Sequence, residues 1–321
     1  GKTENCQVAV SLSFCTERGS LPLAYRLYLP QQWAEDGARR KRAGVPPTIG
    51  FATKGQIALS QIEAVLAAGY PRGVVLADAA YGDEAAWREG LTKLGMIYAV
   101  GVRSGTAVWW GEHQPATLPP LGGRGRLRTR LRRDQAHQPL SVLELAKRLP
   151  AKSFRKVTWR QGVAGKLCSR FARVRVRAAH RDKARAEEWL LIEWPKSEPE
   201  PTHYWLSTLA GEVSLKCLVA TVKSRWMIER DYLELKQEVG LGHFEGRGWR
   251  GFHHHASLAI AAYGFLMLER LRSAGKKNSA RFKEPPLPKG FRPRGAPTHA
   301  APRPVVHRHH LLSTRPRHRP N

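Results

Sequence analysis

An aspartate ends a short hydrophobic segment in the first third of the chain. Residues Val74–Ala77 read VVLA, which is typical of a short buried strand, and Asp78 follows them directly. A carboxylate at the end of a strand lies over the rim of a sheet, where ligands commonly bind. An aspartate before the turn-like residues 79–82 can equally be an ordinary helix or turn cap. The residue types alone leave both interpretations open.

A second group of charged residues occupies 225–236, a segment that we predict to be helical. Four of its side chains fall on one helix face, at offsets i, i+4, i+7 and i+11: Arg225, Glu229, Tyr232 and Lys236. One interpretation is an exposed face whose ion pairs contribute only about 0.2–0.5 kcal/mol each. The other is a functional face, where Glu229 binds a divalent metal ion while Arg225 and Lys236 hold phosphate groups nearby. Both remain open from this segment alone.

The composition points to a polyanionic partner. The chain has 321 residues, 42% of them hydrophobic, so it can bury a sizeable core. Its formal net charge is +28, far more than solubility requires, and nucleic acid is the commonest partner of so basic a protein. Acidic substrates and an anionic membrane surface are weaker alternatives. The longest apolar stretch, 256–268, is too short to span a bilayer, so no membrane segment is expected.

The elements that must position these residues alternate between strand and helix. Segments 6–14 and 21–29 predict a hairpin, and Asp83 is expected to cap a later helix. The order that follows is a helix at 56–68, a strand at Val74–Ala77, a helix at 84–94 and a strand at 97–102. This order predicts a mixed α/β sheet.

The residue composition and the pattern of hydrophobic residues change after residue 102. Residues 1–102 are predicted to be the first part of a core, and 103–209, with an arginine-rich stretch at 124–133, a β-rich insertion. Within the insertion we expect strands at 156–160, 171–177, 189–193 and 204–207. Residues 210–272 return to a helical pattern, with helices at 213–239 and 255–272, and complete the core. Residues 273–321 are rich in Pro, Arg and His, which predicts a disordered basic tail.

Cysteine and histidine patterns do not indicate a metal centre. The four cysteines lack CxxC spacing, which argues against a zinc knuckle or a disulfide framework and favours reduced thiols in the core. The histidines of 253–255 are adjacent, so on a helix they point in different directions and cannot chelate one ion together.

Three segments, taken in order, resemble the DDE transposases of insertion sequences, in which the last catalytic glutamate lies in a Tyr-x2-Arg-x3-Glu-x6-Lys signature. They are LADAAYGD at 76–83, YWLSTLAGEVSL at 204–215 and RWMIERDYLELKQEVGLGHFEGRGWRGFHHH at 225–255. The resemblance covers about residues 5–270. It implies an RNase H-like mixed sheet flanked by helices, with a β-rich insertion before the last catalytic helix. It also implies that Asp78 is the second catalytic acid, Glu229 the third, and Arg225 and Lys236 the basic signature residues.

The resemblance also implies a reaction and its partners. Carboxylates would hold two Mg²⁺ or Mn²⁺ ions for in-line displacement at phosphodiester bonds of double-stranded DNA, both at transposon ends and at the target. A homodimer on DNA and a place at the bacterial nucleoid in the cytoplasm would follow. Trp205 resembles a tryptophan that stacks on a flipped base in some relatives, although a core aromatic on a strand is the alternative.

Two departures from the family pattern affect the expected activity. The signature tyrosine falls at Val222, so Tyr232 is a candidate to supply its phosphate contact. The first catalytic aspartate would lie on a strand before Gly1, so we expect an N-terminally truncated chain that binds DNA without cutting it. The alternative function is a non-catalytic, basic DNA-binding remnant of a decayed element. An RNA-binding protein is a weaker alternative, because no RRM-like aromatic motif or KH-type GxxG clamp is found.

Overall fold

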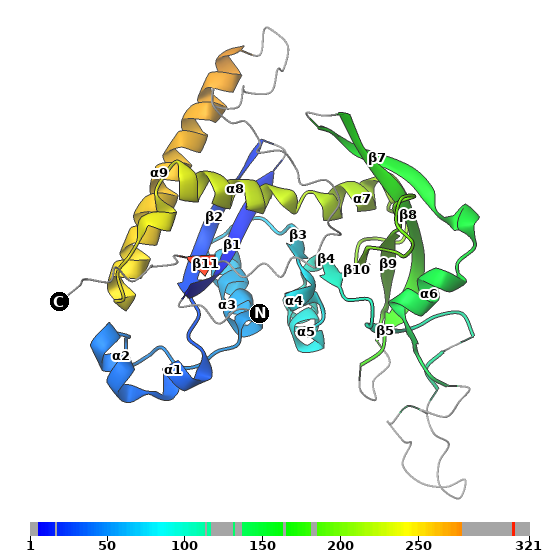
Figure 1. The fold of residues 1–321 in the computed structure, drawn as a ribbon, viewed down its shortest axis with the longest axis horizontal. Coiled ribbons are helices and arrows are strands. Elements are labelled where there is room, and N and C mark those ends of the chain that lie inside the picture. Colours follow the sequence, from blue (N-terminus) through cyan, green and yellow to red (C-terminus); the bar gives the residue numbers. More distant parts are fainter. Residues whose placement is uncertain are drawn as a thin grey trace, which may run out of the picture. The chain divides into compact units, whose positions relative to one another are not determined.

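The computed structural model describes residues 6–16, 18–112, 114–116, 131, 137–162, 165–180, 185–277 and 310–311. These residues form a mixed α/β fold with a mixed sheet flanked by helices, which confirms the predicted fold class (Figure 1). The chain divides into two compact units. The first unit comprises Gly1–Thr53 and Met227–Asn321, and the second unit comprises Lys54–Trp226.

The second unit is built on one sheet, whose described strands run in the order β3-β4-β10-β9-β8-β5-β6, with β7 paired to β8. Only β3 and β4 are parallel, and the other pairs are antiparallel. The strands are β3 (Val74–Ala77), β4 (Ile97–Val102), β5 (Ala107–Trp109), β6 (Leu140–Ser141), β7 (Arg155–Gly162), β8 (Gly165–Ala178), β9 (Glu187–Glu193) and β10 (His203–Ser207).

Each strand predicted from hydrophobic patterning in this unit is present. The strands predicted at 156–160, 171–177, 189–193 and 204–207 correspond to β7, β8, β9 and β10. Because β10 also pairs with β4, these strands continue the sheet that begins at β3. The division of the chain at residues 102, 209 and 272 stays a prediction.

Two short helices link β3 to β4 as a crossover connection: α4 (Ala79–Gly82) and α5 (Ala85–Lys93). The prediction that Asp83 caps the second of these helices is wrong, because Glu84 occupies the N-cap position and makes no side-chain cap bond. Asp83 ends α4, and its carboxylate accepts hydrogen bonds from the Arg103 backbone N–H at 3.0 Å and the Thr106 hydroxyl at 2.9 Å. The sequence pattern did not reveal α4 as a separate helix.

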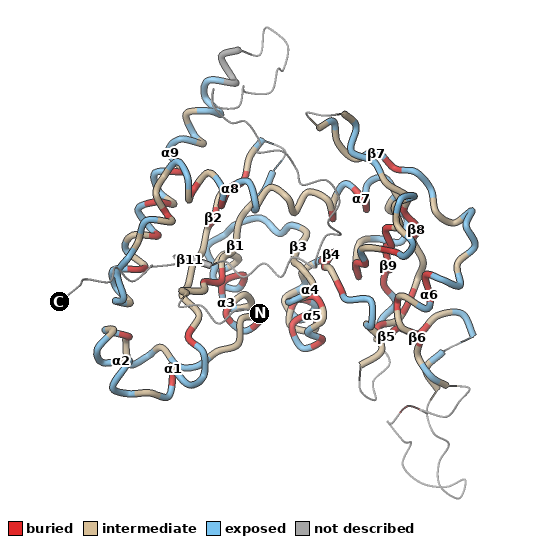
Figure 2. Tube along the Cα trace, viewed as in Figure 1, coloured by how far each residue is buried: buried red, intermediate tan, exposed pale blue. Residues whose placement is uncertain are grey.

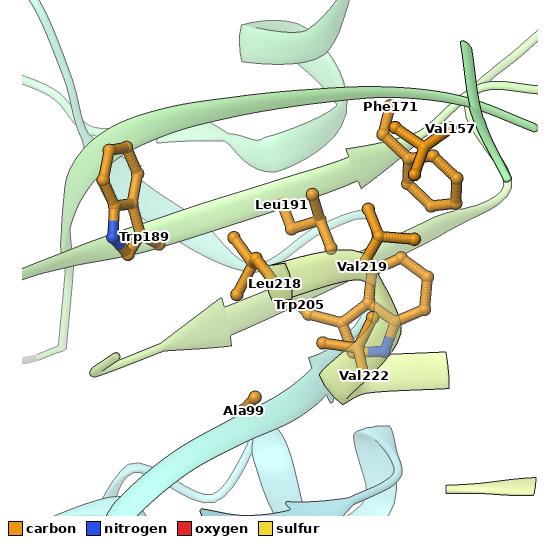
Figure 3. Packing of buried hydrophobic residues seen from close by; sticks show 9 residues of the cluster. All are labelled: Ala99, Val157, Phe171, Trp189, Leu191, Trp205, Leu218, Val219 and Val222. Carbon is orange, nitrogen blue, oxygen red and sulfur yellow. The ribbon is translucent and has the colours of Figure 1, made fainter. Parts of the chain in front are cut away.

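One face of the sheet is covered by α7 (Leu215–Lys223), which places Leu218, Val219 and Val222 against strand residues (Figure 3). Their spacing puts them on one helix face. Buried partners on the sheet include Phe171, Leu191 and the indoles of Trp189 and Trp205. The other helices among the described residues of this unit are α3 (Lys54–Ala67), α6 (Val142–Arg148) and the 3-10 turn η2 (Ala151–Ser153).

The first unit contains the predicted hairpin, formed by β1 (Gln7–Thr16) and β2 (Gly19–Leu27). The short strand β11 (His310–Leu311) pairs with the start of β1. The other elements of this unit are α1 (Gln31–Glu35), α2 (Gly37–Ala43), α8 (Trp226–Gln237), η3 (Leu241–His243) and α9 (Trp249–Lys277).

Helices α8 and α9 pack on the hairpin through regularly spaced residues. On α9 these are Phe252, Ala256, Ala259 and Tyr263, at offsets i, i+4, i+7 and i+11. Figure 2 shows the same alternation of buried and exposed positions along α9. Of the helix predicted over 213–239, residues 215–223 and 226–237 are helical, as α7 and α8. Ser224 and Arg225 form a turn that separates the two helices, and residues 213–214 and 238–239 lie outside them.

Two sequence predictions lie largely outside the described residues. The arginine-rich stretch at 124–133 is described only at residue 131, and the basic tail at 273–321 only at 273–277 and 310–311. In these described residues the predicted disorder is wrong, because 273–277 belong to α9 and 310–311 form β11. Within the described part of the chain, no helix is long and apolar enough to cross a membrane.

Candidate functional site

Asp78 lies at the carboxyl end of β3, as the sequence indicated, and is partly buried. It is the N-cap of α4, where one carboxylate oxygen accepts a hydrogen bond from the Ala80 backbone N–H at 3.0 Å. The capping interpretation is therefore confirmed. A cap bond uses one oxygen of the carboxylate, so the other can still accept a ligand.

The turn that carries Asp78 packs closely on the neighbouring strand. A Cβ atom at Gly82 would collide with the carbonyl oxygen of Gly101 on β4, and one at Gly101 would lie 3.2 Å from the Ala79 nitrogen. Glycine at both positions therefore permits α4 to lie against β4. This contact between α4 and β4 determines where Asp78 lies at the end of β3.

Further carboxylate lies near the same turn. Burial raises the pKa of the Tyr81 phenol, and the negative charges of Asp78 and Glu84 raise it further. The Tyr81 ring also packs against Trp87, with ring centroids 5.4 Å apart. The carboxylates of Asp78 and Glu84 therefore both lie close enough to Tyr81 to act on its phenol.

The second group of predicted residues divides between exposed and buried positions. Glu229 is exposed on α8, whereas Tyr232 is only 4% exposed and lies in the core of the first unit. The Tyr232 ring lies 6.4 Å from that of Tyr25, so its burial argues against the phosphate contact suggested from the sequence. Lys236 is partly buried, and this burial lowers its pKa. Arg225 lies in the turn before α8, not on the helix itself.

Asp78 belongs to the second unit and Glu229 to the first. The prediction that these two carboxylates converge on one metal site stays a prediction.

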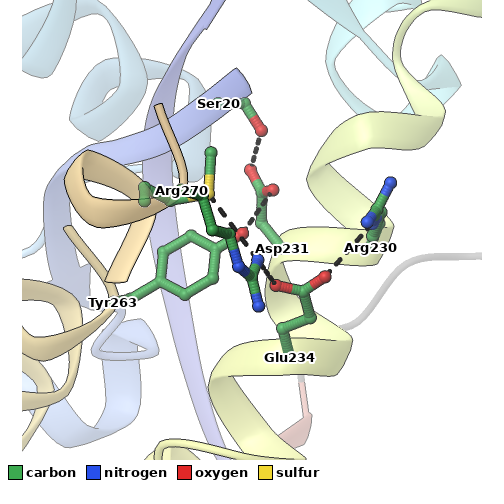
Figure 4. A network of polar contacts seen from close by, with 7 residues as sticks. Ser20, Arg230, Asp231, Glu234, Tyr263 and Arg270 are labelled. Atoms are coloured by element: carbon green, nitrogen blue, oxygen red, sulfur yellow. Dashed lines mark hydrogen bonds and ion pairs between the residues drawn. The ribbon is translucent and has the colours of Figure 1, made fainter. Parts of the chain in front are cut away.

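A buried polar network that the sequence did not indicate holds α8 in place (Figure 4). Asp231, only 4% exposed, accepts hydrogen bonds from the hydroxyl of Ser20 on β2 and, at 3.0 Å, from that of Tyr263 on α9. Burial raises the pKa of Asp231, although both hydrogen bonds oppose that shift. Since Asp231 follows Glu229 by two residues, about 200° around the helix, burying one side chain turns the other outward.

Glu234 extends this network at the surface. It pairs with Arg230 at 3.1 Å and with Arg270 of α9 at 2.7 Å. Burial raises the pKa of Glu234, but the bonds from Arg270 and Arg230 outweigh it and lower the pKa overall. Arg230 and Glu234 have the i,i+4 spacing of an ion pair, but their partner on α9 was not predictable from spacing.

Trp205 is 9% exposed in the core of the second unit, as the alternative interpretation of this residue expected. The ammonium of Lys223 lies 5.3 Å from its ring centroid and also pairs with the carboxylate of Glu193 at 2.6 Å. Burial raises the pKa of Glu193, but bonds from His203 and Lys223 lower it overall. This ion pair links the C-terminal end of α7 to strand β9. Base stacking by Trp205 stays a prediction.

The cysteines and histidines do not form a metal centre within the described residues, where no group of three or more metal-ligating side chains is found. The cysteines are free, as expected, but the expectation that they lie in the core is wrong, since Cys15, Cys168 and Cys217 are exposed. His253 and His255 bond to separate backbone carbonyls, those of Trp249 and Gly240.

Comparison with known protein families identifies the class. A family model described as DDE superfamily endonuclease matches residues 1–166, more than half of the chain. The chain therefore belongs to the DDE superfamily of endonucleases. No curated protein matches it. Membership indicates nuclease activity in general, and enzymes of this class act on DNA and generally use divalent metal ions.

Proposed function

We propose that this protein is the catalytic part of an insertion-sequence DNA transposase, with the Tyr-Arg-Glu-Lys type of signature, that cuts and joins DNA at transposon ends. The observation that carries the proposal is the position of Asp78 at the carboxyl end of β3, in a chain of the DDE endonuclease superfamily. A carboxylate at a sheet edge, with one oxygen free of the cap bond, is suited to bind a cation.

In this proposal Asp78 and Glu229 supply oxygen ligands, which suit Mg²⁺ or Mn²⁺ and not zinc. Two observations support this assignment: the cap bond uses only one carboxylate oxygen of Asp78, and Glu229 is exposed. Two ions would activate the attacking oxygen and stabilise the leaving oxygen of a phosphodiester.

The basic residues have a separate role. Arg225, in the turn before α8, and Lys236, near its end, would hold the phosphates that flank the bond to be cut. Arginine can grip a phosphate with two parallel hydrogen bonds, whereas lysine acts as a point charge. Pairing of two DNA ends would require two copies of the protein, acting at the bacterial nucleoid.

The test is metal-dependent nicking of duplex DNA by the purified protein, and nicking by this chain would contradict the expectation that it binds DNA without cutting it. Asp78→Asn and Glu229→Gln should each reduce nicking by more than about 100-fold, the upper range for loss of a supporting partner of a metal site. DNA affinity should not fall, because each substitution removes a negative charge and so does not weaken attraction to the phosphates. Matched controls are Glu63→Gln on α3 and Glu238→Gln just beyond α8, both at exposed positions, which should nick normally.

The outcomes separate the two candidate functions. Nicking that requires both carboxylates supports the transposase. DNA binding with no metal-dependent nicking under any condition would favour a basic DNA-binding protein without catalytic activity. Nicking that survives both substitutions would show that other residues bind the metal.

A further inference from the structure

The strands β7 and β8 continue beyond the rest of the sheet as a two-stranded ribbon (Figure 1). β9 pairs with β8 only from Phe171 to Arg177, whereas β7 pairs with β8 from Gly165 to Phe171. Among the described strands, residues 165–170 of β8 are therefore paired with β7 alone. The carbonyl of Arg170 also accepts a hydrogen bond, from the Trp194 backbone N–H just beyond β9, at 2.9 Å. We call residues 155–162 and 165–170 the β7–β8 ribbon.

Where it joins the sheet, the ribbon has one covered and one open face. Val157 and its neighbour Phe171 are buried in the core beneath α7. Residues directly opposite each other in an antiparallel pair share a face, and successive residues alternate. The open face therefore carries Lys156, Thr158, Lys166 and Cys168, all of which are exposed.

The charge on this open face is uniformly positive. Neither β7 nor β8 contains an acidic residue. Further along β8, Arg175 is neutralised by Glu187 of β9, at 3.1 Å. Lys156 and Lys166, by contrast, form no ion pair with any residue in the described ranges. Like charges left together on an open surface raise the local positive potential and attract a polyanion.

We propose that the open face of the β7–β8 ribbon is a docking surface for double-stranded DNA, with Lys156 and Lys166 contacting phosphates. A two-stranded antiparallel ribbon fits the major groove of B-form DNA, which is about 12 Å wide. This inference deepens the proposed function and rests on it for the identity of the polyanion. It assigns the ribbon to substrate binding, apart from the residues proposed for catalysis.

The first experiment measures the salt dependence of DNA binding without divalent metal. Lys156→Gln with Lys166→Gln should lower the slope of log affinity against log salt by about 1.8, because each phosphate contact contributes about 0.9 to that slope. The matched control removes the same charge from exposed positions elsewhere in the second unit, by Lys196→Gln with Lys216→Gln. A slope lowered equally by both double variants, or by neither, would overturn the proposal.

The second experiment uses two exposed cysteines as reporters. Cys168 lies on the open face of the ribbon, and Cys217 lies on α7, the helix that covers the opposite face. Each is kept as the single cysteine, with the others changed to Ser, and is labelled with a photoactivated cross-linker. Cross-linking to duplex DNA is expected from Cys168 and not from Cys217. The reverse result, equal yields, or no cross-link from either would overturn the proposal.

Competition with double-stranded RNA tests the assignment to DNA. The major groove of A-form RNA is deep and narrow and does not admit such a ribbon. Equal affinity of the protein for the two duplexes, with an equal effect of the lysine substitutions, would overturn the groove assignment. Because these assays omit the metal, failure of the docking proposal is distinguishable from failure of the catalytic one, which is measured by nicking.

Discussion

The absence of a side chain at Gly82 and Gly101 allows the turn that carries Asp78 to lie close against β4. The carbonyl of Gly101 occupies the space that a Cβ atom at Gly82 would need. We predict that Gly82→Ala destabilises the protein by about 1–3 kcal/mol, the usual cost of overpacking, because backbone on both sides must shift. Urea unfolding measures the loss.

The matched control is Gly105→Ala, at an exposed position where an added Cβ meets nothing within 4 Å. This change should be neutral or slightly stabilising, because alanine reduces the freedom of the unfolded chain. Equal stability of the two variants would show that α4 can move away from β4 at little cost. DNA nicking by the Gly82 variant should also fall, since the displaced turn carries Asp78.

Glu188 on β9 offers a prediction about pH. It is 4% exposed, and it accepts a hydrogen bond from the Tyr98 hydroxyl at 2.8 Å. Burial raises the pKa of Glu188, and the nearby charges of Arg88 and Arg185 only partly oppose this. The folded protein thus keeps this proton to a higher pH than the unfolded chain. Its contribution to stability is full below the unfolded pKa and is lost as pH rises through the folded pKa.

Glu188→Gln should remove this loss, because an amide stays neutral and can still accept the Tyr98 hydrogen bond. The free energy of unfolding of the variant, relative to the unsubstituted protein, should therefore increase from acidic to neutral pH, by about 1.4 kcal/mol for each unit of pKa difference. Urea unfolding over a pH series measures it, with Glu63→Gln as the exposed control. A difference between variant and parent that is constant with pH would contradict the assignment.

At the scale of secondary-structure elements, helix α8 depends on one buried carboxylate for its orientation. Asp231 bonds to Ser20 of the hairpin and to Tyr263 of α9. Asp231→Ala would leave both hydroxyls without this acceptor, and we predict a loss of about 1–3 kcal/mol. Asp231→Asn, which retains an acceptor, should cost less. Thermal unfolding measures both.

Glu229→Gln is the control for that prediction, since Glu229 is exposed on the other side of α8. A surface change of this kind should alter stability by no more than about 0.5 kcal/mol. If Asp231→Ala were as harmless as Glu229→Gln, the buried network would not be what fixes the rotation of α8.

Local periodicity explains which elements were predictable. The strand Val74–Ala77 and the strand Ile97–Val102 have the bounds expected from their hydrophobic runs. The break at Ser224–Arg225 was missed because apolar spacing continues through it, and no glycine or proline marks the end of α7. A pattern that repeats on both sides of a turn does not reveal the turn.

Tertiary contacts explain what was missed in the candidate site. Ser20 and Asp231 are 211 positions apart, so no spacing rule could join them. Of the four residues predicted to share a helix face, Arg225 lies in the turn before α8, and spacing does not say which of Glu229, Tyr232 and Lys236 are buried. The tyrosine is in the core, because Tyr25 and Phe252 come from β2 and α9 to meet that side of α8.

At the scale of the whole molecule, the two units differ in how the chain builds them. The second unit, Lys54–Trp226, is continuous in sequence, whereas the first is assembled from two separated segments. A continuous unit with its own core can fold independently. We predict that the fragment 54–226 unfolds in one cooperative urea transition.

A shorter fragment, 54–209, is the matched control for that prediction. It lacks α7, whose Leu218 and Val219 are fully buried against the sheet. Removal of this helix should abolish the cooperative transition. If both fragments unfolded alike, α7 would not be part of the folding unit, and if neither were cooperative, the second unit would require the first.

The excess positive charge of the whole chain bears on how it holds DNA. The net charge is +28, and residues 278–321 include many arginines but only one acidic residue, Glu284. Each phosphate neutralised by a lysine or arginine releases counterions. The slope of log affinity against log salt is therefore proportional to the number of phosphates that the protein contacts. Deleting residues 278–321 should therefore lower the slope of log affinity against log salt by several units, because each phosphate contact contributes about 0.9. The affinity should fall similarly for unrelated duplex sequences, since phosphate contacts carry no sequence information.

The lysine substitutions in the ribbon can be combined with this deletion. If the ribbon and the basic tail contact different phosphates, Lys156→Gln with Lys166→Gln should lower the slope in the deleted chain by the same amount as in the full chain. A slope unchanged by the deletion would mean that residues before 278 make the phosphate contacts.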